Sequence, residues 1–249
     1  MAYFHGSVYS ENLGMATNVH AIIPQDGRKN KVLYLLHGIC EDASAWPRYS
    51  RIECHAIERG WTVIMPDGAR SFYLDMAYGA NYFSYVTDEL PGICANIFGI
   101  KHKREETFIA GLSMGGYGAM KCALSRPDVY GGGASFSGSL NMGKRLNQDN
   151  ARWKKETCAT YGEGGQFADG DNIFELIKKV GGLRPEERPR ILLTCGASDG
   201  FLQESLTAAE LLTQYGFVFK YMEWDGGHEW GFWDKSAQYA MDFFEGKLC

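Results

Sequence analysis

Short apolar runs alternate with longer amphipathic stretches along most of this chain. Strands buried in a parallel sheet form continuous apolar runs, whereas amphipathic helices repeat apolar residues every three or four positions. Strands are therefore expected at residues 3–9, 16–23, 31–37, 61–65, 107–111, 131–137, 190–195 and 217–222. Helices are expected at 47–59, 85–98, 114–126, 203–215 and 233–245, and Pro91 should kink the second or delay its start. This order predicts an α/β fold: a mainly parallel central sheet of about eight strands, opened by an antiparallel hairpin, with helices on both faces.

Residues 141–189 break the alternation. They contain no convincing strand, but they include a mixed, helix-prone stretch with Trp153, Phe174 and Leu176. The segment therefore predicts a helical insertion between the sixth and seventh strands. At that place an insertion would either cover the ends of the strands as a lid or pack on the core as a surface decoration. Both interpretations have equal weight.

Composition fits one enzyme-sized unit. The 249 residues, 45% hydrophobic and 22% charged, can bury one sizeable core, so a single domain over residues 1–249 is expected. The net charge of -5 comes without a basic block, which argues against nucleic acid and an anionic membrane surface as partners. No apolar run is long enough to span a bilayer, and the first residues lack the features of a signal peptide. A cytoplasmic location is therefore expected.

The cysteines are scattered and include no Cys-x-x-Cys pair. They stand at positions 40, 54, 94, 122, 158, 195 and 249. An odd number with irregular spacing favours reduced thiols over a disulfide framework or a zinc site. No metal and no cofactor are expected.

The segment from Thr107 to Met120 carries the most specific chemical signal. An apolar strand runs into Gly111-Leu-Ser113-Met-Gly115 and then into a helix of small residues. Such a turn is a nucleophile elbow, in which a strained backbone lifts the serine hydroxyl above the sheet and flanking glycines avoid collisions. The pattern predicts that Ser113 is a nucleophile, with the N-terminus of the helix favouring the negative charge of acyl transfer.

A nucleophilic serine needs a base and a group that orients the base. Asp199 follows the strand candidate 190–195, and His228 lies on a glycine-flanked loop after the strand candidate 217–222. The order serine, aspartate, histidine is that of an α/β-hydrolase triad. Asp225 and Asp67 compete with Asp199, which we favour because it follows the penultimate strand and has a tight glycine turn behind it.

His37 is the main rival to His228 as the base. It ends a strand candidate on the same side of the sheet as Ser113, but its place long before the serine suits an oxyanion segment better. In that segment the backbone N–H of Ile39 would stabilise the tetrahedral oxyanion, and the residue after the nucleophile, Met114, would supply the second N–H.

Several apolar side chains are expected around this site. Loops at the same edge of the sheet carry aromatic residues that could form a substrate pocket or pack structurally: Trp46, Phe201, Trp230 and Phe232. Cys40 directly follows Ile39, and a buried structural thiol is favoured over a reactive one lining the pocket.

Motifs along nearly the whole chain resemble the Putative esterase family of α/β-hydrolases. These are His37-Gly-Ile39, Met65-Pro-Asp-Gly68, Ser71-Phe-Tyr73, Asp88-Glu-Leu-Pro91, Gly111-Leu-Ser-Met-Gly-Gly116, Ser137-Gly138 and Gly226-Gly-His228. The family includes S-formylglutathione hydrolase (esterase D), tributyrin-type short-chain esterases, feruloyl and acetylxylan esterases and mycolyltransferases. Compact length and the segment 67–85 are most similar to the tributyrin type. Formylglutathione hydrolases usually carry a histidine before the nucleophile, where this chain has Leu112.

The resemblance implies a cofactor-independent serine carboxylesterase that acts on short-chain acyl esters through an acyl-enzyme. The alternatives within enzymes are a thioesterase of the S-formylglutathione hydrolase type and a feruloyl or acetyl carbohydrate esterase. A non-catalytic binding protein on a hydrolase scaffold is disfavoured, because every element of the triad is present. The expected partners are a small-molecule ester and, for a homo-oligomer, further copies of the chain.

Overall fold

The computed structural model describes residues 1–26, 31–146, 150–164 and 167–248. Eight strands form one sheet in the order β1-β2-β4-β3-β5-β6-β7-β8. Their bounds are β1 Ala2–Ser10, β2 Met15–Ile23, β3 Val32–Leu36, β4 Thr62–Pro66, β5 Thr107–Leu112, β6 Gly132–Phe136, β7 Arg190–Gly196 and β8 Phe219–Trp224. The first two strands pair antiparallel, β2 joins β4 antiparallel, and every later pair is parallel. The predicted hairpin and parallel sheet are confirmed.

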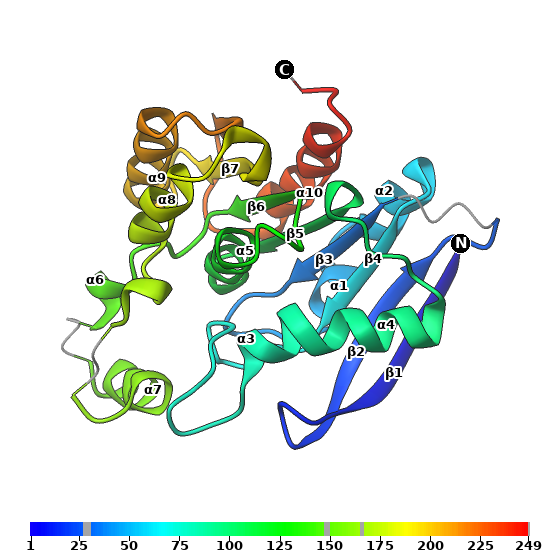
Figure 1. Ribbon diagram of the computed structural model, residues 1–249, viewed down its shortest axis with the longest axis horizontal. Helices are drawn as coiled ribbons and strands as arrows, with labels where there is room; N and C mark the ends of the chain where they lie inside the picture. The colour runs from blue at the N-terminus through cyan, green and yellow to red at the C-terminus, as the bar shows by residue number, and fades with distance from the viewer. Residues whose placement is uncertain (27–30, 147–149, 165–166, 249) are drawn as a thin grey trace.

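The helices lie on both faces of this sheet (Figure 1). The α-helices are α1 Ala45–Tyr49, α2 Ile52–Arg59, α3 Tyr82–Ser84, α4 Leu90–Phe98, α5 Met114–Ser125, α6 Met142–Leu146, α7 Ala151–Tyr161, α8 Ile173–Gly181, α9 Leu202–Gln214 and α10 Trp230–Phe244. Side chains of β3 alternate between two apolar clusters: Tyr34 meets the cluster of α4, α5, α8 and α9, whereas Leu35 meets that of α2 and α10. The central strands are therefore buried on both faces, which explains their continuous apolar sequence.

Two predicted helices differ in detail from the observed ones. The helix expected at 47–59 is broken between α1 and α2, because the Ser50 hydroxyl donates to the carbonyl of Trp46 and accepts from the amide of Ile52. A serine hydroxyl that forms hydrogen bonds with nearby backbone groups competes with the backbone hydrogen bonds of a helix. The helix expected at 85–98 continues through Pro91, and a π-helical turn, Tyr85–Glu89, lies directly before α4. That turn accommodates the missing N–H and the bulk of the proline ring.

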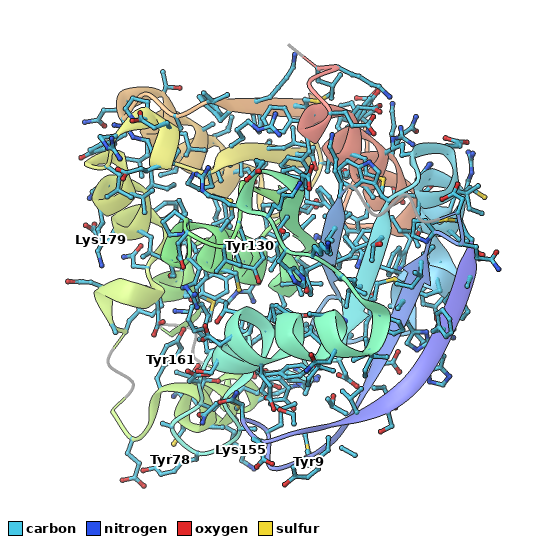
Figure 2. The ribbon with its side chains drawn as sticks, turned by 45° about the vertical axis from the view of Figure 1, so that its right-hand side comes forward. Tyr9, Tyr78, Tyr130, Lys155, Tyr161 and Lys179 are labelled. Carbon is cyan, nitrogen blue, oxygen red and sulfur yellow. The ribbon has the colours of Figure 1, made fainter. Side chains whose placement is uncertain are left out.

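Two parts of the region between β6 and β7 pack differently. Helix α8 packs against α5 and α9 in the core. Helices α6 and α7 lie farther out, beside the loop that follows β4 (Figure 1). Figure 2 shows Lys155 and Tyr161 on α7; Lys155 is exposed, whereas Trp153 and Tyr161 pack on the core. Within the described residues, no helix has the length and apolar character needed to cross a membrane.

Six cysteines lie in the described part of the chain, and all six are free thiols. Cys94, Cys122 and Cys195 are buried, and burial raises the pKa of each. Cys40 is exposed, so the expectation of a buried structural thiol at that position is wrong. The loop turns outward after Ile39, which is only partly buried. Cys249 lies outside the described residues.

Candidate active site

The candidate residues come together at the carboxyl ends of four parallel strands. Ser113 follows β5, the segment His37–Ile39 follows β3, Asp199 follows the end of β7, and His228 follows β8. These ends share one edge of the sheet because β3, β5, β6, β7 and β8 run parallel (Figure 1). The topology thereby gathers side chains that are far apart in sequence.

Ser113 lies in the strained turn that the motif predicts. Its backbone angles are φ 54° and ψ -113°, a conformation that is costly for a residue with a side chain. The serine amide donates to the carbonyl of Phe136 at 2.9 Å, which holds the turn against β6. A Cβ atom at Gly111 would lie 2.4 Å from the carbonyl oxygen of Gly115, and one at Gly115 would lie 2.5 Å from that of Leu36. Only glycine fits this close approach of α5 to β3 and β5.

A chain of two contacts joins the three candidate residues. The Oγ of Ser113 lies 3.0 Å from Nε2 of His228, and Nδ1 of His228 lies 2.9 Å from Oδ2 of Asp199. Burial raises the pKa of Asp199, but the hydrogen bonds from His228 and from the Phe201 amide outweigh it and hold that pKa below its ordinary value. The carboxyl group is therefore ionised at neutral pH. It accepts a hydrogen bond from the Nδ1–H of His228, which leaves Nε2 free to accept one from the serine hydroxyl.

The loops that carry Asp199 and His228 are bonded to each other. The amide of Ala197 donates to Trp224, and the amide of Ser198 donates to Gly226, both at 3.0 Å. Gly196 makes this approach possible, because a Cβ atom there would lie 2.4 Å from the Gly226 carbonyl oxygen. Since both loops are fixed to one another, the acid and the imidazole keep their separation.

The rival residues lie in other environments. Asp225 is exposed, and the imidazole of His228 contacts Asp199 instead. Asp67 accepts a hydrogen bond from the Ala69 amide at 2.9 Å, and its Oδ1 lies 3.5 Å from Nε2 of His37. Burial raises the pKa of Asp67, but its interactions with His37 and Ala69 outweigh burial and hold that pKa below its ordinary value. Neither aspartate takes the place of Asp199 beside the imidazole.

His37 is buried and engages backbone groups through both ring nitrogens. Nδ1 donates to the carbonyl of Gly38 at 2.7 Å, and Nε2 accepts from the amide of Gly68 at 2.9 Å. The N–H and C=O of one trans peptide point in opposite directions. With the Gly38 carbonyl directed at the imidazole, the Ile39 N–H of the same peptide points away from it. This arrangement fits an oxyanion segment, as the sequence order suggested, and not a base.

Two further features bear on the oxyanion segment. The Gly38 amide donates to Oε2 of Glu41 at 2.9 Å, and Trp230 Nε1 donates to Oε1 of the same carboxylate at 3.0 Å. Glu41 therefore links this segment to the start of α10. Met114 is the first residue of α5, and the first amides of a helix lack partners within the helix. A donor at this position can serve an anion.

The four aromatic candidates divide into two pairs. The ring of Phe201 lies 5.1 Å from that of His228, and Trp230 is partly buried against Trp46. Trp46 is fully buried and donates its indole N–H to Leu36, while Phe232 is 2% exposed and stacks on Trp224 at 4.0 Å. Trp46 and Phe232 lie inside helices of the core, not on loops, and in this structure they present no surface to a substrate.

Sequence reasoning missed two side chains beside the site. The ring of Trp233 lies 4.8 Å from that of His228 at 86°, so the imidazole contacts Trp233 as well as Phe201. Its position one helical turn after Trp230 was an available signal. The guanidinium of Arg145, on α6, lies 4.9 Å from the centre of the Phe201 ring. No local pattern distinguishes that arginine from a surface residue.

Comparisons with known proteins agree with this geometry. Residues 10–238 match the model of the family described as Putative esterase. The chain is 31% identical over 264 residues to an acetyl esterase of Caldicellulosiruptor saccharolyticus, covering 98% of each. The fluorophosphonate-binding serine hydrolase FphF of Staphylococcus aureus is similar with a TM-score of 0.88, 28% identity and 98% coverage of each chain. The S-formylglutathione hydrolase FrmB of the same organism is similar with a TM-score of 0.85, 29% identity and 98% coverage of each chain. The chain therefore belongs to the Putative esterase family of α/β-hydrolases and is a serine esterase.

Proposed function

We propose that this esterase hydrolyses short-chain acyl esters through a triad of Ser113, His228 and Asp199. The observation that carries the proposal is the pair of contacts, 3.0 Å and 2.9 Å, that runs from a strained serine through an imidazole to a buried carboxylate. Strain at a non-glycine residue is typical of functional sites. The similarity to an acetyl esterase supports a small acyl group.

The geometry supports an acyl-enzyme mechanism. Ser113 Oγ attacks the ester carbonyl carbon while Nε2 of His228 takes the serine proton. The N–H groups of Ile39 and Met114 stabilise the oxyanion of the tetrahedral intermediate. As that intermediate collapses, the imidazolium gives its proton to the leaving alcohol and Asp199 keeps the ring in the correct tautomer. Water then attacks the acyl-enzyme by the same route, with His228 as the base.

Phe201 and Trp230 remain our candidates for contact with the substrate. Phe201 lies beside the imidazole and under the guanidinium of Arg145, so the α6 part of the insertion borders the site. This placement favours a lid role for α6 and α7, whereas α8 serves the core.

Substitution of the serine tests the mechanism. Ser113→Ala should abolish ester turnover and leave the circular dichroism spectrum and the melting temperature near those of the wild type, because one hydroxyl is removed. It should also abolish covalent labelling by a fluorophosphonate probe. Turnover retained by Ser113→Ala would contradict the proposed nucleophile.

A substrate panel separates the candidate activities. We expect kcat/KM for nitrophenyl acetate and butyrate to exceed that for the decanoate, and acetylated sugars and feruloyl esters to be weaker. Thioester hydrolysis is the second candidate, because FrmB is one of the similar structures. S-formylglutathione as the best substrate would replace the ester assignment while leaving the triad intact.

A further inference from the structure

The loop after β4 is strained around Arg70, a partly buried cation. Ala69, Phe72 and Tyr73 have φ of 44°, 54° and 54°, although none of them is glycine. The fully buried Ser71 fixes the loop by donating to the Gly68 carbonyl at 2.6 Å and accepting from the Tyr73 amide at 2.9 Å. Arg70 lies in the middle of this strained segment. Such strain persists only where the surroundings hold it, and it is typical of functional regions.

Arg70 bonds two segments that are otherwise distant in the sequence. Its Nη1 donates to the carbonyl oxygen of Ile39 at 2.9 Å. Its Nε and Nη2 donate to Oε1 of Glu156 at 3.0 Å and 2.5 Å. Glu156 belongs to α7, so one guanidinium joins the insertion to the residue whose N–H is the proposed oxyanion donor. The planar, multiply donating guanidinium suits such a bridge better than an ammonium.

Two hydrogen bonds hold the two peptide groups on either side of Ile39. His37 holds the peptide between Gly38 and Ile39 through the Gly38 carbonyl. Arg70 holds the next peptide through the Ile39 carbonyl. With the peptides on both sides of the Ile39 Cα fixed, the backbone angles of Ile39 are fixed too. Cys40, immediately beyond, is exposed. The Ile39 N–H lies in the peptide that His37 holds, and the peptide that follows it is held by a contact from outside the loop.

We propose that Arg70 is a positioning residue, which aims the Ile39 N–H at the oxyanion only while Glu156 of α7 holds the guanidinium. The inference rests on the proposed triad mechanism and adds a coupling between α7 and the oxyanion segment. Arg70 acts through Ile39, and Glu156 acts through Arg70. Loss of either side chain should therefore weaken stabilisation of the transition state more than it weakens binding of the ground-state ester.

The test compares Arg70→Met, Arg70→Lys, Glu156→Gln and the double variant Arg70→Met/Glu156→Gln in the full chain. With nitrophenyl acetate, Arg70→Met should lower kcat by about tenfold to a hundredfold, below the loss of about 10² to 10³ seen when an oxyanion donor is removed outright. KM should stay within about twofold of the wild type. Arg70→Lys should recover part of kcat, because an ammonium can still reach the Ile39 carbonyl.

Arg184 and Glu187 supply a matched control. They form an exposed bridge of 2.8 Å, and Arg184→Met and Glu187→Gln should leave kcat unchanged. The double variant should be no slower than Arg70→Met alone, because the two residues act as one unit. A trifluoromethyl ketone, which the serine converts to a tetrahedral oxyanion, should bind to Arg70→Met more weakly by the same factor as the loss of kcat.

Four results would overturn the proposal. Three of them are kinetic: a loss confined to KM, additive losses in the double variant, or unchanged affinity for the ketone despite a lower kcat. The fourth result is a general loss of structure in Arg70→Lys. It would be recognised by a lower melting temperature together with loss of fluorophosphonate labelling. Failure of the triad mechanism is distinguishable, because it requires Ser113→Ala to retain turnover, whichever result the Arg70 variants give.

Discussion

Asp199 combines burial with an ionised carboxyl group, so its removal is informative. Asp199→Asn should lower kcat by about 10⁴, as in the serine protease precedent, because an amide lets the imidazole take the wrong tautomer. Steady-state kinetics with nitrophenyl acetate measure the loss. Asp225→Asn is the matched control, since Asp225 is an exposed aspartate of the neighbouring loop. A large loss in Asp225→Asn with none in Asp199→Asn would reassign the acid.

The same carboxyl group makes stability depend on pH. Burial raises the pKa of Asp199, but its hydrogen bonds lower that pKa by more, so the net shift is downward. The folded protein therefore binds the proton less tightly than the unfolded chain does. The ionised group therefore stabilises the fold above about pH 4, the ordinary carboxyl pKa, and this contribution disappears as the pH falls through the lower folded value. The difference in unfolding free energy between wild type and Asp199→Asn, measured by urea denaturation, should shrink from pH 6 to pH 3. A difference that stayed constant would contradict this assignment.

Cys40 offers a probe beside the oxyanion segment. The thiol is exposed and follows Ile39, so a bulky maleimide adduct should reduce esterase turnover by crowding the segment. Cys40→Ser should keep most of the activity and resist the reagent. Mass spectrometry identifies the labelled residue, because Cys54 is also exposed, and Cys54→Ser provides the comparison. Full activity after complete labelling of Cys40 would place the thiol away from the site.

At the scale of elements, the packing of α5 on the sheet leaves no room for a methyl group at Gly115. Gly115→Ala should push α5 away from β3, destabilise the protein by about 1–3 kcal/mol and abolish activity, because the turn at Ser113 would shift. Gly92→Ala is the control: it lies on α4 with nothing within 4 Å, and it should stabilise the protein by about 0.5–1 kcal/mol. Thermal unfolding and nitrophenyl acetate turnover measure both effects. Equal effects of the two substitutions would argue against the close approach.

The predicted ranges overlap every strand of the sheet. Continuous apolar runs mark the buried parallel strands β3 to β6, whereas β1 is largely exposed and β8 is only partly buried. The break in the first predicted helix was not expected, whereas a late start or kink near Pro91 was, and α4 begins at Leu90. The break at Ser50 depends on the hydrogen bond from its hydroxyl to the Trp46 carbonyl, which the sequence does not reveal. The π-helical turn before Pro91 likewise has no marker of its own in the sequence. Trp46 and Phe232 were assigned to the pocket because sequence order gives the edge of the sheet but not the direction of a side chain.

For the whole molecule, the three residues of the proposed triad could be named from the sequence because each has a local signal and the chain order is constrained. Ser113 and His228 are 115 positions apart, yet the elbow and the glycine loop each mark a strand end. Arg70 and Glu156, 86 positions apart, have no such marks. An arginine in a loop and a glutamate on a helix resemble surface residues until the fold brings them together. Long-range polar contacts of this kind are therefore visible only in three dimensions.

The exposure of His228 also bears on the fate of the acyl group. Its side chain is 36% exposed, whereas Ser113 and Asp199 are buried. A nucleophile that resolves the acyl-enzyme must pass its proton to this imidazole, and solvent reaches the ring directly. Small alcohols should therefore compete with water, and part of the acetyl group should appear as methyl acetate when methanol is added. With an accessible imidazole, we expect the protein to act as an acyl transferase in alcohol as well as an esterase in water.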